Sequence, residues 1–110
     1  MAGMERAERE DIAVGVKHGR DYEFILADLT TAVGRIQDSY LFFEMEPSEW
    51  EVLSDADRNE VLEALAEDLF FGLGTEPMIE VGSAIVIYDP EGHRINFLIG
   101  DAELTSVSLI

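Results

Sequence analysis

The stretch AIVIYDPEGHRINFLIG, residues 84–100, decides the fold because it has the pattern of two strands joined by a tight turn. Asp-Pro-Glu-Gly is a turn signal, and the runs on either side are rich in β-branched and aromatic residues. We expect a three-residue loop, Pro90–Gly92, with Asp89 opposite His93 and Gly92 in the left-handed conformation.

This loop sets the pairing of the two strands. It places Ile87 against Ile95 and Ile85 against Phe97, which gathers the bulky residues on one face. A four-residue loop would shift the pairing by one residue and turn side chains to the wrong face. The three-residue loop is therefore preferred.

Further strand-like segments flank this hairpin. LTSVSLI, near the end of the sequence, alternates apolar and polar residues, and so does the run that holds Ile12, Val14 and Val16. Residues 12–17 form either an extra N-terminal strand or a continuation of helix from the charged arm before them. We predict a C-terminal three-stranded antiparallel meander with strands over about 79–88, 94–99 and 104–109.

A long helical stripe precedes the strands. Seven apolar residues recur at alternating spacings of four and three, which is one face of a helix: Tyr22, Leu26, Leu29, Val33, Ile36, Tyr40 and Phe43. We expect this helix over about 21–45, with Asp21 as its N-cap. It must stop before Pro47, which disfavours helical geometry in the preceding residue. A strand over 39–46 is the alternative, but fewer positions obey its period.

A second main helix is predicted over about 55–71. Ser54 suits its N-cap, Val61 and the leucines that follow it at spacings of three and four form its buried stripe, and Gly72 supplies the stop. Between the two helices, Ser48 and Glu51 have the spacing of a capping box, which predicts one short helical turn.

These elements predict one α+β domain over residues 1–110. The helices and the meander each have one apolar face, so the economical arrangement is two layers, with the helical pair on the sheet. A chain of 110 residues can bury a single core and rarely two. The first ten residues alternate charge with alanine, and we expect a mobile N-terminal arm over 1–10.

The charge balance argues against several classes of partner. Twenty-four acidic residues face seven basic ones, which gives a net charge of −17. Nucleic-acid binding needs clustered lysine and arginine, and an anionic membrane repels such a chain, so neither is an expected partner. Solubility, adaptation to high salt and attraction to a basic protein remain as explanations of the charge.

Cysteine and long apolar runs are both absent from the sequence. Disulfides, thiolate metal sites and a cysteine nucleophile are therefore excluded. No apolar run approaches the ~20 residues of a membrane span. The first residues lack an apolar signal-peptide core, so a cytoplasmic location is the expectation.

The densest carboxylates are the candidates for chemistry: Glu44, Glu46, Glu49, Glu51, Asp55 and Asp57. Dedicated calcium loops turn at an obligatory glycine, and no glycine occurs between Gly34 and Gly72. The two histidines, His18 and His93, lack a local zinc-binding spacing. No serine lies in a G-x-S-x-G elbow, and FFGLGTE lacks the lysine of a phosphate-binding loop. We expect no metal, no cofactor and no enzymatic activity.

An excess of apolar residues near these acids is the remaining feature. It forms either a second small core at the helical corner or an exposed interaction surface. The candidate surface combines large apolar anchors with a glutamate rim: Phe42, Met45, Trp50, Phe70 and Phe71, with Glu44, Glu46, Glu49 and Glu51. A meander also leaves strand edges unpaired, which leaves strand-to-strand dimerisation open as a way for two copies to associate.

The leading hypothesis is a small acidic, non-enzymatic protein that acts as a protein–protein interaction or regulatory module. Its partner is either a basic protein or a second copy of the chain. Two alternatives remain open. One is a metal- or ligand-binding protein that uses the Glu44–Asp57 carboxylates, and the other is an acidic mimic of nucleic acid that blocks a basic site.

Overall fold

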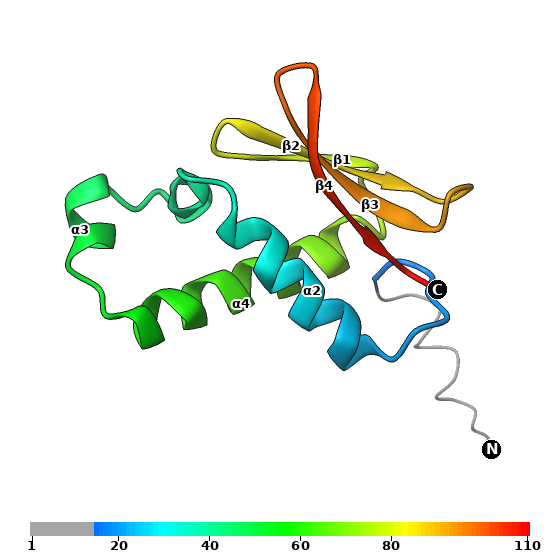
Figure 1. Cartoon of the computed structure of the whole chain (residues 1–110), viewed down its shortest axis with the longest axis horizontal. Helices are drawn as coiled ribbons and strands as arrows, with labels where there is room; N and C mark the ends of the chain where they lie inside the picture. Colours follow the sequence, from blue (N-terminus) through cyan, green and yellow to red (C-terminus); the bar gives the residue numbers. More distant parts are fainter. Residues whose placement is uncertain (1–14) are drawn as a thin grey trace.

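The structure is a helical layer packed on one face of an antiparallel sheet (Figure 1). It is a computed structural model that describes residues 15–110. Within these residues, three α-helices and one 3₁₀ helix precede four strands: α2 (Tyr22–Gly34), η1 (Ser39–Phe43), α3 (Pro47–Glu51), α4 (Asp55–Gly72), β1 (Met78–Val81), β2 (Ala84–Asp89), β3 (Arg94–Ile99) and β4 (Ala102–Ser108). The predicted α+β class is confirmed. Within residues 15–110, every helix is too short or too polar to span a lipid bilayer.

The sheet is a meander in the order β1-β2-β3-β4, with every neighbouring pair antiparallel. The segment predicted as one strand over 79–88 is two strands, because Gly82 and Ser83 form a turn between Val81 and Ala84. Gly82 takes a φ of 57°, which suits the first position of a two-residue hairpin turn. The described sheet therefore has four strands rather than the three predicted for the meander.

The predicted register of the central hairpin is wrong by one residue. Val86 lies opposite Phe97, and Tyr88 lies opposite Ile95. Val86, Phe97 and Ile95 are fully buried against the helices. The isoleucines of β2 therefore point to the opposite face of the sheet.

The hairpin loop explains this shift, because it spans four residues, Pro90–His93, rather than three. The Oδ1 atom of Asp89 accepts a hydrogen bond from the Gly92 N–H at 3.0 Å, and its Oδ2 lies 3.6 Å from Nε of Arg94. His93, and not Gly92, takes the left-handed conformation, with a φ of 54°. The Asp89 carboxylate thus stabilises a longer loop than the sequence pattern predicts.

Helix α2 ends at Gly34, eleven residues before the predicted end at residue 45. Ile36 is buried although it lies beyond the helix, so the apolar spacing continues where the helix does not. In the turn that follows, Oδ1 of Asp38 accepts hydrogen bonds from the N–H and the hydroxyl of Ser83, both at 3.1 Å. A tertiary contact to the β1–β2 turn therefore replaces the last turns of the predicted helix.

The predicted capping box of Ser48 and Glu51 is also wrong. Glu46 is the N-cap of α3, and Oε1 of Glu49 accepts a hydrogen bond from the Glu46 N–H at 2.9 Å. Pro47 lies at the start of the helix, where a missing N–H leaves no intrahelical bond unmade. The short helix thus begins two residues earlier than the Ser48 cap implied.

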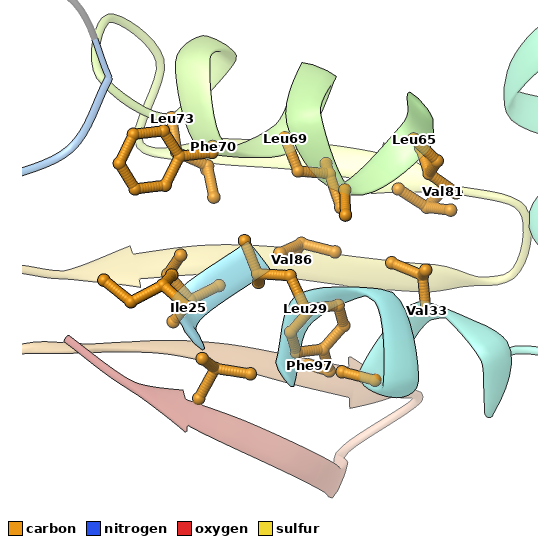
Figure 2. Packing of buried hydrophobic residues seen from close by; sticks show 14 of the residues in the cluster. Ile25, Leu29, Val33, Leu65, Leu69, Phe70, Leu73, Val81, Val86 and Phe97 are labelled. Atoms are coloured by element: carbon orange, nitrogen blue, oxygen red, sulfur yellow. The ribbon is translucent and has the colours of Figure 1, made fainter. Parts of the chain in front are cut away.

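Helix α4 matches its predicted bounds closely. Oγ of Ser54 accepts a hydrogen bond from the Asp57 N–H at 3.1 Å, as expected of an N-cap. The core lies between this helix, α2 and the inner face of the sheet (Figure 2). Ten residues that expose 2% or less of their surface form its centre: Ile25, Leu29, Val33, Leu65, Leu69, Phe70, Leu73, Val81, Val86 and Phe97.

The extra strand predicted over 12–17 is not formed at residues 15–17. Val16, in this segment, is nevertheless buried in the core. Residues 12–14 and the arm predicted over 1–10 lie outside the described residues.

Candidate functional site

Residues 39–64, which we name the helical corner, contain η1, α3 and the first half of α4. In Figure 1, α3 and the start of α4 extend away from the sheet, while η1 lies nearer to it. The helical corner includes all six of the carboxylates and three of the five apolar anchors that the sequence singles out. The helical corner is therefore the candidate binding site.

Trp50 and Arg58 hold the helical corner together. The Trp50 ring stacks on Tyr40, with ring centroids 5.4 Å apart, and the Arg58 guanidinium lies 5.2 Å from the Trp50 centroid. Arg58 also donates hydrogen bonds to the carbonyl oxygens of Trp50 and Glu51, each at 3.1 Å. Both carbonyls lie in the last turn of α3, and the Trp50 carbonyl also accepts a hydrogen bond from the Leu53 N–H at 3.2 Å. Trp50 is half-buried, and its contacts connect η1, α3 and α4.

The helical corner contains a groove of about 440 Å³. Five apolar and two acidic side chains line it: Phe43, Met45, Leu53, Asp57, Glu60, Val61 and Ala64. The end of η1 and the chain after it supply one wall, and one face of α4 supplies the other. Phe43 keeps 38% of its surface exposed. A groove of this size is large enough to accept a small ligand or a few side chains.

The surroundings of the groove are strongly negative. Eight acidic residues of the helical corner are all exposed: Glu44, Glu46, Glu49, Glu51, Asp55, Asp57, Glu60 and Glu63. Arg58 is the one basic residue in this range, so the helical corner has a net charge of −7. Charges of one sign around a low-dielectric groove concentrate the field there and attract ions of the opposite sign.

The structure brings together only part of the predicted interaction surface. Met45 lines the groove, and Phe42 and Trp50 are half-buried in the same corner. Phe70 is 2% exposed and belongs to the core, so it does not form part of a surface. Phe71 is 44% exposed but lies at the opposite end of α4 from the groove. The four predicted rim glutamates all stay exposed in the helical corner.

Phe71 belongs instead to an aromatic cluster with Tyr22. The Tyr22 ring meets Phe70 edge-on at 4.9 Å and stacks on Phe71 at 6.2 Å. Burial raises the pKa of the Tyr22 hydroxyl above its usual value, and the nearby Glu67 carboxylate raises this pKa further. The phenol is neutral at physiological pH, and this cluster serves to pack α2 against α4.

Sequence reasoning missed five groove residues, which are Phe43, Leu53, Glu60, Val61 and Ala64. Phe43 was assigned to the stripe of a helix that in fact ends nine residues earlier, and Val61 was assigned to the buried stripe of α4. A signal was present, since Asp57, Glu60, Val61 and Ala64 follow the spacing of one helix face. That spacing identifies the face but not whether another element covers it.

Among the described residues, the acidic side chains do not converge into a metal site. Within residues 15–110, no group of three or more histidine, aspartate or glutamate side chains is arranged to hold a metal ion. Nδ1 of His18 donates to the Val16 carbonyl at 2.9 Å, and its ring packs against Phe70. His93 lies in the β2–β3 loop. The metal-binding alternative therefore gains no geometric support.

Comparisons with known proteins give no match. No protein-family model matches the sequence, and no curated protein or solved structure matches the chain. The functional conclusion is therefore argued from the geometry and charge of the groove.

Proposed function

We propose that this protein is a small, non-enzymatic interaction module whose helical corner binds a basic segment of another protein. One observation carries this proposal: an apolar groove opens among eight exposed carboxylates. The groove provides the contact area, and the carboxylates select the charge of the partner. Exposed apolar surface rimmed by charge is the usual appearance of a protein interaction site.

The floor of the groove favours bulky apolar side chains. Burial of one leucine, isoleucine or phenylalanine side chain contributes about 1.5–3 kcal/mol. Met45 is unbranched and polarisable, so it can adapt to side chains of different shape. Several partner side chains of this kind would bind the groove with useful affinity even after the loss of chain entropy.

The rim of the groove favours lysine and arginine beside those apolar residues. Asp57 and Glu60 line the groove itself, and the remaining acids of the helical corner surround it. Arg58 is already bonded to Trp50 and Glu51. The preferred ligand is therefore a segment in which bulky apolar residues alternate with basic ones, and an acidic segment would be repelled.

No specific observation favours the other hypotheses. A metal site requires several oxygens that converge on one point, which the helical corner does not show. A mimic of nucleic acid would act through charge alone, so the apolar floor would have no part in its binding. The titration below separates these cases.

The test is a fluorescence-anisotropy titration of the full chain against three labelled peptides. One peptide combines leucine with lysine, a second combines leucine with glutamate, and a third combines glycine with lysine. We expect saturable binding of the leucine–lysine peptide and at least tenfold weaker binding of the other two, about 1.4 kcal/mol. Equal binding of the glycine–lysine peptide would contradict the proposal, because charge alone would then suffice.

A further inference from the structure

A second apolar surface lies on the face of the sheet that points away from the helices. Residues that pair directly across antiparallel strands point to the same side. Met78 pairs with Ile87, and Ile85 pairs with Leu98, so these four residues share one face. We name them the outer cluster. Among the described residues, α2 and α4 lie on the opposite face, where Val86 is fully buried (Figures 1 and 2).

The outer cluster remains accessible. Met78 is 54% exposed, and the other three members are half-buried by their neighbours in the sheet. At the centre of the covered face, by contrast, Val86, Ile95 and Phe97 are each 0% exposed. This face is therefore apolar surface without a partner within residues 15–110.

The outer face carries little of the chain's negative charge. The strand registers assign to it three carboxylates, Glu80, Asp89 and Glu103, and one guanidinium, Arg94. Its net charge is −2, against −17 for the whole chain. Nε of Arg94 lies 3.6 Å from Oδ2 of Asp89, which neutralises part of this charge. The face therefore lacks the acidic excess that would recruit a basic partner.

The edges of the sheet are less suited to association than its face. At one edge, Gly19 and Arg20 donate backbone hydrogen bonds to the Leu109 carbonyl at 2.7 and 3.1 Å, and Nη1 of Arg20 donates to Ser108 O at 2.8 Å. A register shift between β3 and β4 further distorts this edge. The other edge is β1, which is only four residues long. Covered ends, bulges and short edge strands oppose edge-to-edge pairing.

We propose that the outer cluster is the contact surface of a homodimer, in which a second copy of this chain packs sheet face against sheet face. A twofold arrangement brings the same apolar patch of each copy together and keeps the acidic helical corners apart. This inference does not depend on the function proposed for the groove.

The size of the outer face limits the area that the dimer can bury. Four strands about 4.8 Å apart and about six residues long, at about 3.3 Å per residue, give a footprint of roughly 400 Å² per copy. Two copies then cover on the order of 800 Å², which is below the area of a standard stable interface. The dimer is therefore weak, and it forms reversibly as the protein concentration rises.

Salt gives this dimer a distinctive response. Two copies that each carry a net charge of −17 repel one another, and added salt screens this repulsion. Dimerisation therefore strengthens with salt. An attraction between a basic partner and an acidic surface would weaken under the same conditions.

The test is sedimentation velocity of the full chain over a range of concentrations, at low and at high salt. Ile87→Lys introduces a charge into the outer cluster, and Val52→Lys introduces the same charge at a position that is 81% exposed in the helical corner. Both changes reduce the net negative charge equally, so repulsion between copies falls by the same amount. We expect at least a tenfold loss of association for Ile87→Lys and no loss for Val52→Lys.

A second measurement keeps the test decisive if Ile87→Lys does not fold. Methyl NMR spectra of the unaltered chain at low and high concentration should show shifts at Met78, Ile85, Ile87 and Leu98. A chain that stays monomeric at high salt and high concentration would overturn the proposal. Association with methyl shifts confined to the helical corner or to other surfaces would overturn it equally.

Discussion

The groove of the helical corner and the outer face of the sheet are both apolar, but they differ in charge. Eight carboxylates and one guanidinium belong to the helical corner, whereas three carboxylates and one guanidinium lie on the outer face. Apolar contact supplies affinity for almost any partner, and the charge around it decides which partner is admitted. We therefore expect the groove to select basic segments and the outer face to select a second copy of the chain.

The largest expected effect is that of a charge placed inside the groove. Val61→Lys removes an apolar contact and adds a cation that repels a basic ligand. We expect the affinity for the leucine–lysine peptide to fall roughly 30-fold, about 2 kcal/mol. Val52→Lys is the matched control, because it makes the same chemical change outside the groove. Equal losses in both variants would mean that net charge, and not the groove, governs binding.

Salt should separate the two regions by the direction of its effect. Raising the ionic strength shortens the Debye length from about 30 Å at 0.01 M to about 8 Å at 0.15 M. Peptide binding in the groove should weaken several-fold over this range, while self-association should strengthen. Anisotropy and sedimentation in the same buffers provide the two readouts. Responses of the same sign would remove the electrostatic distinction between the regions.

Trp50 tests whether the groove depends on the architecture of the helical corner. Trp50→Ala removes the stack on Tyr40 and the contact with Arg58, and we expect the free energy of unfolding to fall by about 2 kcal/mol. The peptide affinity should fall with it, since α3 loses its attachment to α4. Trp50→Phe keeps an aromatic stack and should recover part of both losses. Denaturant titration measures the stability, and self-association should stay unchanged in either variant.

The smallest expected effect is the contribution of Tyr22 to stability at high pH. Tyr22 packs α2 against α4, and these helices belong to the layer between the groove and the sheet. Its pKa in the folded state is raised above the unfolded value near 10. Its contribution to stability is thus fully present below about pH 10 and is lost as the pH rises through the folded-state pKa. Tyr22→Phe should reduce the decline of stability above pH 10, as measured by denaturant titration. An unchanged decline would show that other groups cause it.

The parts of the fold that depend on local chemistry could be predicted from the sequence. Ser54 and the apolar spacing after it identify α4 because the cap and the stripe both lie within the helix itself. The end of α2 and the register of the β2–β3 hairpin could not be predicted in the same way. The first depends on a hydrogen bond from Ser83 to Asp38, 45 residues away in sequence, and the second on the Asp89 carboxylate in the loop.

In the candidate site, too, features set by local sequence could be predicted and features set by tertiary packing could not. Met45 and the glutamates could be predicted because they lie in one short acidic segment. Phe70 and Phe71 are adjacent in sequence, yet only the packing of α4 determines that Phe70 is buried and Phe71 exposed. Val61 lies on a helix face that local spacing can identify, but only the path of the chain after η1 turns that face into a groove wall. The location in the cell and the identity of the partner stay predictions.

An NMR titration of the full chain with the leucine–lysine peptide tests the central claim most directly. At a concentration where the chain is monomeric, we predict saturable shifts at Met45, Leu53, Val61 and Ala64. Ile85, Ile87 and Leu98 should stay unchanged throughout the titration. Shifts centred on the outer cluster, or small shifts spread evenly over all acidic surfaces, would contradict the claim that the groove is the binding site.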